Sequence, residues 1–144
     1  MATIDVYGFE DLDSVFKHIR DIPWEVTEDA LQEMGAVLIE KVKREGEAMG
    51  IRDPESSQHV LDTLTLAKAK KTDAGGIQNV TFRGSRTRGR TRTRNAEIAF
   101  VNEYGKRGQR ARPFMAQAMK QHEKEIREPG EKRIGDWLEK EWKN

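Results

Sequence analysis

The residues with the clearest chemical character are six arginines between positions 83 and 94. The segment reads Arg-Gly-Ser-Arg-Thr-Arg-Gly-Arg-Thr-Arg-Thr-Arg and contains no acid. Arginine forks bind phosphates and carboxylates, and no aromatic residue is interleaved here to stack on bases. Three interpretations stay open: a solvated mobile loop, a contact with the DNA backbone, and a contact with an acidic patch on a partner protein. The six residues are Arg83, Arg86, Arg88, Arg90, Arg92 and Arg94.

A second basic segment lies between a glycine turn and a proline. Gly105 and Gly108 permit sharp backbone turns. Pro113 fits the first position of a helix, where its missing N–H has no helical partner. Phe114 then begins an apolar stripe. The basic residues of this segment that we group with the six arginines as candidate contacts for assembly or nucleic acid are Lys106, Arg107 and Arg110.

The histidines lack the spacing of a metal site or a catalytic site. His18, His59 and His122 are far apart and form no HxxH or HExxH pattern. His122 and Glu125 stand one helical turn apart, which is a weak metal signal. The chain has no cysteine, so it has neither disulfides nor thiolate ligands. No glycine-rich phosphate loop and no nucleophile elbow occurs. We therefore expect a protein that is not an enzyme and that uses no cofactor or metal.

Length and composition indicate one domain over residues 1–144. Hydrophobic and charged residues each make up 35%, so we expect solvated pieces or subunit contacts that complete the core. The net charge is only +1, but charges of opposite sign are separated along the chain, because the acidic residues concentrate in 5–55 and 123–141. No apolar run approaches the roughly 20 residues that span a membrane. The acidic start does not resemble a signal peptide, and we expect a soluble, unexported protein.

Apolar spacing predicts two long helices and shorter ones at each end. The strongest pattern is Thr27–Glu45, with Thr27 as its cap and with Gly46 and Gly50 marking its exit. A short amphipathic helix is expected over Phe9–Arg20. The second long helix runs over 113–127, Pro129-Gly130 breaks it, and a C-terminal helix resumes over 131–143.

Strand patterns fill the middle of the chain. Residues 62–70 and 77–83 read as two strands joined by the turn signal at Asp73, and the apolar run Ala96–Asn102 reads as a third. The arginine segment is then a mobile loop or the outer part of a hairpin between the second and third strands. The expected fold is α+β: an antiparallel sheet of about three to four strands, packed by two long helices, with short N- and C-terminal helices.

The segment 95–119 resembles the small tail-component family of long-tailed bacteriophages and prophages, also described as tail-completion or head–tail joining proteins. In that family an apolar strand leads into Glu-(Tyr/Phe)-Gly, a variable polar loop, Arg/Gln-Pro-Phe and an alanine-containing helix. The helix 27–45 looks like the family's first long helix, so the resemblance covers about 27–127. The family often has Gly-Thr at 105–106, and segment 71–94 is unusually rich in arginine here. The matching residues are Glu103, Tyr104, Gly105, Arg112, Pro113 and Phe114.

This resemblance implies a structural component of the virion that acts by assembly. The protein would complete the tail or join it to the head, as a homo-oligomeric ring, a hexamer being one form, in contact with other neck or tail proteins. It would be assembled in the bacterial cytoplasm and would end in the neck or tail of the virion. The six matching residues would be architectural, and the basic residues would make contacts. The alternative is a nucleic-acid-binding module that uses the arginine segment 83–94 on the DNA backbone.

Overall fold

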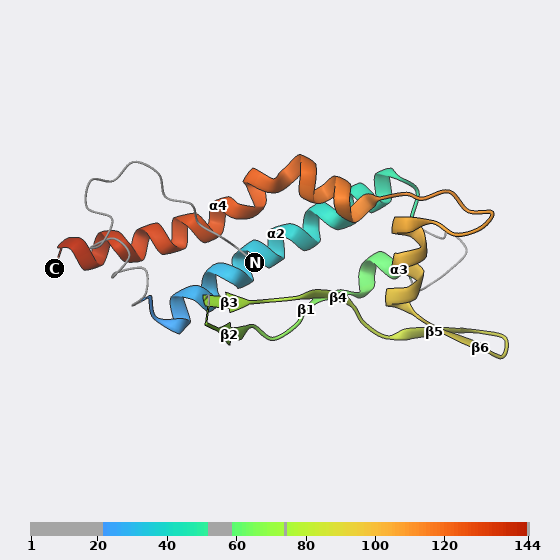
Figure 1. The fold of residues 1–144 in the computed structure, drawn as a ribbon, viewed down its shortest axis with the longest axis horizontal. Helices are drawn as coiled ribbons and strands as arrows, with labels where there is room; N and C mark the ends of the chain where they lie inside the picture. The colour runs from blue at the N-terminus through green and yellow to red at the C-terminus, as the bar shows by residue number, and fades with distance from the viewer. Residues whose placement is uncertain (1–21, 52–58, 74, 144) are drawn as a thin grey trace.

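Two long helices and a set of short strands form an α+β fold. Figure 1 shows the computed structural model, which describes residues 22–51, 59–73 and 75–143. Helices α2 (Trp24–Ala48) and α4 (Phe114–Lys143) pack against each other, and short strands pair into small two-stranded antiparallel sheets. The predicted class is confirmed at this level. The helix predicted over Phe9–Arg20 lies outside the described residues, as does most of the segment 50–59.

Helix α2 confirms the strongest prediction and extends it by three residues at each end. The expected cap at Thr27 is wrong, because the helix begins after Pro23. The Pro23 carbonyl accepts hydrogen bonds from the backbone N–H groups of Val26 (3.1 Å) and Thr27 (3.3 Å). Pro23 fixes its own φ near the helical value, so the chain enters the helix without a side-chain cap.

The end of α2 is set by Gly50 and not by Gly46. Gly50 has φ +75, and the N–H of Ile51 donates to the carbonyl of Gly46 (2.9 Å), which is the Schellman arrangement. Gly46 lies inside the helix and is buried. A Cβ there would meet the side chain of Leu61 at 2.6 Å. Glycine at 46 therefore serves close packing and does not end the helix.

Helix α4 is continuous through the predicted break. It includes Pro129, and its one non-helical residue is His122 (φ −119, ψ 17). The prediction that Pro129-Gly130 separates two helices is therefore wrong. An interior proline disfavours a helix by about 3 kcal/mol, but here α4 packs along α2. Gly130 is buried there, where an added Cβ would collide with the side chain of Met34. The expected C-terminal helix is thus the last part of α4.

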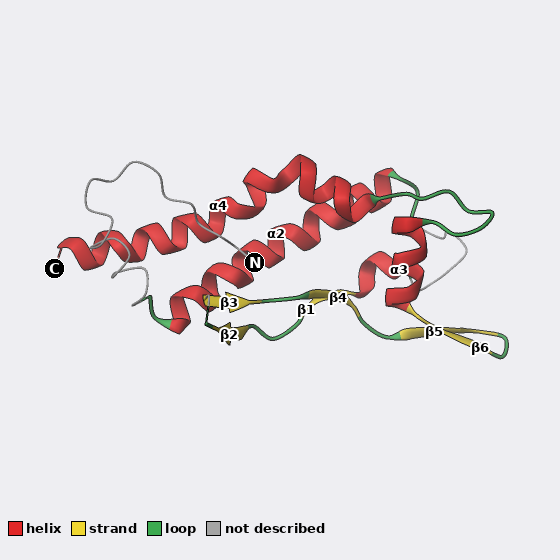
Figure 2. Cartoon of the chain, in the orientation of Figure 1, coloured by secondary structure: helices red, strands yellow, loops and turns green. Residues whose placement is uncertain are grey.

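Residues 60–82 form the hairpin that the turn signal predicts. After the 3-10 helix η1 (Val60–Thr63), β1 (Leu64–Leu66) pairs with β4 (Val80–Phe82), and Leu64 lies opposite Phe82. Nearer the turn, β2 (Lys70–Thr72) pairs with β3 (Gly75–Ile77). Between the two sheets, the side-chain amide of Gln78 donates to the carbonyl of Ala67 (2.9 Å). The two predicted strands are therefore one hairpin interrupted in its middle (Figure 2).

The predicted strand over 96–102 is wrong, because these residues belong to helix α3 (Asn95–Tyr104). The buried residues are Asn95, Ala99, Asn102 and Glu103, which recur with the helical period and include three polar side chains. The apolar run did not reveal this helical period, because an apolar run predicts burial of all its members. Its largest member, Phe100, points to solvent with 60% of its surface exposed. The spacing of the buried residues, and not the local run of apolar residues, therefore indicates that this segment is a helix and not a strand.

With no third strand at 96–102, the predicted single sheet of three to four strands is also wrong. The described strands pair only in twos, as β1–β4, β2–β3 and β5–β6. The last pair, β5 (Ser85–Arg88) and β6 (Thr91–Arg94), is formed by the arginine segment itself. It leads into helix α3 and not into a strand.

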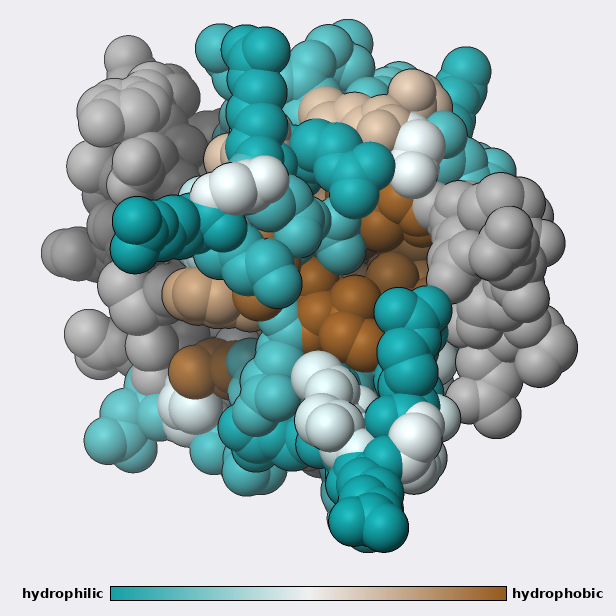
Figure 3. All heavy atoms as spheres, turned by 90° about the vertical axis from the view of Figure 1, so that its right-hand side faces the viewer, coloured by the Kyte–Doolittle hydropathy of each residue, from teal (hydrophilic) through white to brown (hydrophobic). Residues whose placement is uncertain are grey.

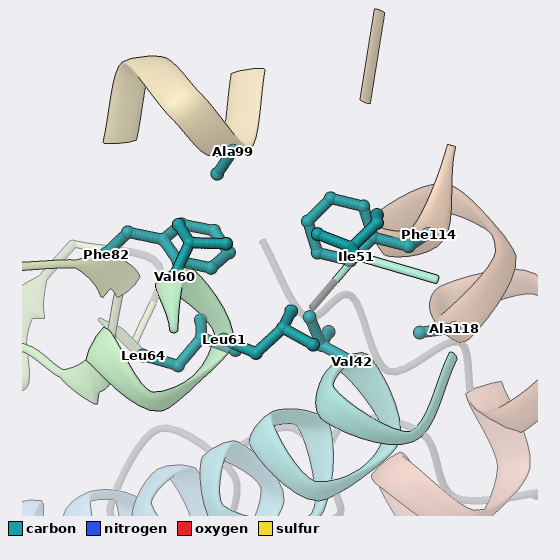
Figure 4. Close-up of a cluster of buried hydrophobic side chains, with 9 residues drawn as sticks. All are labelled: Val42, Ile51, Val60, Leu61, Leu64, Phe82, Ala99, Phe114 and Ala118. Atoms are coloured by element: carbon teal, nitrogen blue, oxygen red, sulfur yellow. The ribbon is translucent and has the colours of Figure 1, made fainter. Parts of the chain in front are cut away.

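The core lies where α2 ends and α4 begins. Figure 4 shows its side chains converging from α2, η1, β1, β4, α3 and α4. Phe114 is fully buried, and its ring meets the edge of Phe82 with centroids 6.2 Å apart at 67°. Ala99 of α3 and Ala118 of α4 are buried in the same cluster. The cluster comprises Val42, Ile51, Val60, Leu61, Leu64, Phe82, Ala99, Phe114 and Ala118.

Candidate functional site

The arginine segment folds as a two-stranded hairpin. Its register places each arginine of a strand opposite a hydroxyl residue: Arg94 faces Ser85, Arg92 faces Thr87, and two further pairs continue the pattern. Because cross-strand partners share a face, each face of the hairpin carries two strand arginines and no pair of like charges stands directly opposite. Gly89, with φ +62, makes the turn. The hairpin therefore presents guanidinium groups on both of its faces.

Some of these guanidinium groups have partners within the molecule. Arg92 Nε donates to Ser85 Oγ (2.7 Å), which ties the two strands together. Arg94 donates to Glu97 Oε1 through both Nε (3.1 Å) and Nη2 (3.0 Å). Both partners of this ion pair are largely exposed. Such a pair contributes little to stability. Arg83 and Arg90 are exposed, at the base and the tip of the hairpin.

The loop 105–112 is a small turn that exposes further positive charge. Lys106 and Gln109 exchange backbone hydrogen bonds of 3.1 and 2.9 Å. Gly105 and Gly108 have φ +77 and +82, as such a turn requires. Lys106, Arg107 and Arg110 are all exposed.

The two basic segments lie at the same end of the molecule, on either side of α3 (Figure 1). We call this the basic end and define it by the nine residues predicted to make contacts. The structure thus brings together segments that the sequence separates. Figure 3 views this end and shows hydrophobic surface near its middle with hydrophilic side chains around it. The nine residues are Arg83, Arg86, Arg88, Arg90, Arg92, Arg94, Lys106, Arg107 and Arg110.

Glu103 of the Glu-Tyr-Gly motif caps the next helix. Its carboxylate accepts hydrogen bonds from the backbone N–H groups of Met115 (2.8 Å) and Ala116 (3.0 Å), at the first turn of α4. The residue is only 5% exposed. A buried carboxylate here satisfies two N–H groups that have no partner within the helix and complements the positive end of its dipole. Glu103 therefore fixes α4 relative to α3.

We expect Glu103→Ala to lower the free energy of unfolding by about 2 kcal/mol, because helix caps and hydrogen bonds to charged groups contribute on that scale. Urea denaturation followed by circular dichroism measures the loss. The matched control is Glu97→Ala, on the same helix but exposed, for which we expect a change within about 0.5 kcal/mol. Equal losses for the two variants would mean that the contacts of Glu103 with α4 do not stabilise the fold.

Arg112 connects α3 to the end of α2. Its guanidinium donates to Asn102 Oδ1 (2.5 Å) and to the carbonyls of Met49 (3.3 Å) and Gly50 (3.1 Å). The backbone N–H of Arg112 also donates to the Asn102 carbonyl (2.7 Å). These carbonyls lie at the C-terminus of α2, where a positive charge is favourable. Arg112 is thus half-buried and held by contacts within the molecule, in contrast to the exposed basic residues nearby.

Pro113 and Phe114 follow Arg112 and lead into α4. The Pro113 carbonyl accepts a hydrogen bond from the N–H of Gln117 (3.0 Å), so Pro113 immediately precedes the first helical residue. The joint links the end of α2, the end of α3 and the start of α4. We call it the three-helix joint; its members are Glu103, Gly105, Arg112, Pro113 and Phe114.

Tyr104 is placed differently from the other motif residues. It is 67% exposed and packs against Phe100, one turn earlier on α3, with ring centroids 4.7 Å apart. The pair lies beside the basic end. Sequence reasoning missed Phe100 as a surface residue, because an apolar run predicts burial. The signal that was available is the four-residue spacing of the two aromatics on a helix.

A polar network lies between α2 and α4 at the irregular residue His122. Its Nε2 lies 3.0 Å from Glu45 Oε1, and its Nδ1 lies 3.5 Å from Glu125 Oε1. Glu125 Oε2 forms an ion pair with Lys41, whose Nζ lies 2.7 Å away and whose side chain is almost entirely buried. The hydrogen bond and charge of Lys41, together with the hydrogen bond of His122, lower the pKa of Glu125. The sequence showed that His122 and Glu125 stand one helical turn apart, but it did not predict their contacts with Glu45 and Lys41 of α2.

We expect this network to stabilise the fold less at acid pH. The carboxyl of Glu125 has a folded pKa below its ordinary value of 4.5, so its contribution is present above about pH 4.5 and is lost as pH falls through the lowered pKa. Glu125→Gln should therefore unfold at a lower temperature than the wild type at about pH 6, and the difference should shrink as the pH falls below 4.5 and through the lowered pKa of Glu125. A difference that stays constant over this range would contradict the assignment. The effect is small because this carboxylate is more than half exposed.

The described residues contain no group of three or more histidine, cysteine, aspartate or glutamate side chains placed to hold a metal ion. Among the helices of the described segments, none combines the length and the apolar character that crossing a membrane requires. Comparison of the chain with models of protein families, with curated proteins and with solved structures gives no match. Any statement of function therefore rests on the chain's own residues and their arrangement.

Proposed function

We propose that this protein is a non-enzymatic structural component of a bacteriophage virion, which completes the tail or joins it to the head. It acts by assembling into a ring, a hexamer being one form, with copies of itself and with other neck or tail proteins. It assembles in the bacterial cytoplasm and ends in the virion. The short N-terminal helix over Phe9–Arg20 and the family-like core over 27–127 belong to this proposal.

The observation that carries the proposal is the three-helix joint. Glu103 and Gly105 stand on one side of the basic loop, and Arg112 and Phe114 stand on the other, as in the motif of the tail-component family. Each has a contact or a backbone conformation that holds the helices: a cap on α4, a turn with positive φ, a link to α2 and a buried ring. This arrangement leaves the loop between them exposed. An architecture that holds a loop outward is suited to assembly with other subunits.

The experiment is to remove this protein from a phage that encodes it and to image the particles. We expect heads and tails that form but do not join, and joined particles when the wild-type protein is supplied. Particles that join normally without the protein would overturn the proposal. The position of the coding sequence among portal, capsid and major tail proteins is an independent check.

The second candidate function is binding to nucleic acid through the β5–β6 hairpin. A specific observation favours it, since neither face of this hairpin carries an apolar residue, and a two-stranded hairpin is marginally stable on its own. A polyanion against its guanidinium groups would supply the missing stabilisation. If all six arginines neutralise phosphates, the logarithm of the affinity falls with the logarithm of salt concentration with a slope of about −5. Absence of binding to duplex DNA at low salt would exclude this function.

A triple variant tests whether the arginines of the hairpin serve contacts with other molecules or the stability of the fold. We expect Arg88→Ser, Arg90→Ser and Arg92→Ser together to leave the fold intact, with the free energy of unfolding changed by less than about 1 kcal/mol, because exposed side chains contribute little. The same variant should fail to join heads to tails, or should lose DNA binding if the second function holds. Thermal unfolding measures the first effect. A variant that is unfolded at room temperature would show that the hairpin is part of the core.

A further inference from the structure

Helix α3 exposes a surface whose composition is that of a protein interface. We call it the α3 face; it consists of Ala96, Glu97, Phe100 and Tyr104, all exposed. Phe100 and Tyr104 pack on each other and leave most of their surface in water. Aromatic residues with neighbouring arginines are enriched in the anchors of protein interfaces. Two adjacent exposed aromatics therefore mark this face as a contact site.

The charges around the α3 face favour a protein partner over a polyanion. Glu97 lies on the face itself, paired with Arg94, so the surface carries both signs of charge beside its apolar centre. A carboxylate in this position repels phosphates. Lys106, Arg107 and Arg110 of the neighbouring loop are exposed and supply an excess of positive charge. The matching partner is thus a protein segment with an acidic surface.

The chain itself carries such a segment at the opposite end of the molecule. Residues 24–33 of α2 contain four acids and no base, and we call them the acidic start of α2. Helices α2 and α4 run antiparallel, which places this start at the far end from α3 and the basic end (Figure 1). Asp29 is already paired with Arg133 (3.2 Å), and Glu25 and Glu33 are exposed. The four acids are Glu25, Glu28, Asp29 and Glu33.

We propose that the α3 face of one copy binds the acidic start of α2 of the next copy. Phe100 and Tyr104 form the apolar centre of this contact, and the basic residues of loop 105–112 pair with the acids. The two surfaces differ and lie at opposite ends, so the contact is heterologous and repeats from copy to copy until a ring closes. This inference rests on the proposed function, because it names the contact that builds the ring.

Cross-linking tests the contact, because the chain has no cysteine of its own. Ala96→Cys places a thiol on the α3 face, and Glu25→Cys places one on the acidic start of α2. With a short bis-maleimide, the double variant should give a ladder of covalent trimers and larger species, whereas each single variant stops at a dimer. The matched control combines Ala96→Cys with Glu128→Cys, an exposed acid on α4, and should give no ladder.

Two further variants test the chemistry of the contact. Adding Phe100→Ser to the double-cysteine protein should reduce the species above dimer by about tenfold, because it removes the apolar anchor. Adding Ile77→Ser instead, at an exposed apolar residue of β3, should leave the ladder unchanged. Absence of a ladder, an equal ladder from the control pair, or a ladder that needs added duplex DNA would each overturn the contact.

These results are distinguishable from failure of the proposed function. The ladder is measured on purified protein, whereas the proposed function is judged by whether heads and tails join when the protein is missing. Unjoined particles without a ladder would retain the function and reject this contact. A ladder from a protein that is dispensable for joining would retain the contact and reject the function.

Discussion

Phe114→Ala should lower the free energy of unfolding by roughly 3–5 kcal/mol, the loss expected when a fully buried phenylalanine is truncated. Phe114 has no exposed surface, contacts the edge of Phe82 and lies against the helix at Gly46, where an added Cβ would meet the Phe114 ring at 3.3 Å. The side chain therefore occupies the meeting point of α2, β4 and α4. Urea denaturation and the shift of the thermal midpoint measure the loss.

The matched control for this prediction is Phe100→Ala. It removes the same side chain from a neighbouring helix, where the ring is 60% exposed. We expect a change within about 0.5 kcal/mol. The comparison isolates burial from residue type, and a loss for Phe114→Ala no greater than that for Phe100→Ala would show that Phe114 does not anchor the core. Phe100→Ala is expected to act on assembly.

Gly105→Ala should lower the free energy of unfolding by about 3 kcal/mol or more. Gly105 has φ +77 and ψ 177, a backbone region that is occupied almost only by glycine and that strains other residues by about 1–3 kcal/mol. A Cβ at this position would also lie 2.8 Å from the backbone nitrogen of Ala111 and 2.9 Å from the carbonyl oxygen of Gln109. Backbone atoms cannot move aside as a flexible side chain does, so the loop must shift. Calorimetry of the purified variant measures the effect.

Gly108→Ala is the control in the same loop. Gly108 also has a positive φ, +82, but an added Cβ would meet no atom within 4 Å. We expect a loss of about 1 kcal/mol, from the backbone conformation alone. If the two variants lose the same stability, the close approach of residues 109–111 to Gly105 does not matter for the fold.

These two predictions concern the joint and not the surface. A motif that resembles a functional signature is, in this chain, a set of internal contacts: a cap, a strained turn, a guanidinium on helix carbonyls and a buried ring. Its substitution therefore changes stability. The residues proposed to contact other molecules lie beside it and are exposed, so their substitution should change assembly and leave stability nearly unchanged. The two sets of variants thus have opposite expected effects.

Local interactions made part of the fold predictable from the sequence. In α2, Leu31, Met34, Leu38 and Val42 recur at the three- to four-residue spacing of a helix. The hairpin of 64–82 was visible because Asp73 and Gly75 mark a turn between alternating residues. The start of α4 was predicted to within one residue, because proline is favoured where a helix begins; the helix starts at Phe114, immediately after Pro113. In each case the interactions that decide the structure lie within a few residues.

The tertiary structure decided the rest. Pro129 does not end α4, because packing along α2 at Gly130 offsets the local cost of the proline. Residues 95–104 are a helix because Ala99, Asn102 and Glu103 are buried together, which the apolar run does not reveal. The partners of Glu103 are backbone N–H groups, which any residue supplies, so the sequence carries no mark of the contact.

For the basic end and the α3 face, too, part was predictable from the sequence and part was decided by the tertiary structure. Sequence alone located the positive charge in two segments, 83–94 and 105–112, because charge is a property of residue type. Only the fold places both segments at one end, on either side of α3, and puts the acidic start of α2 at the other end. It also leaves Phe100 and Tyr104 of α3 exposed. The physical reason is that relative position depends on how α2, α3 and α4 pack. That packing is fixed by contacts between residues far apart in the chain.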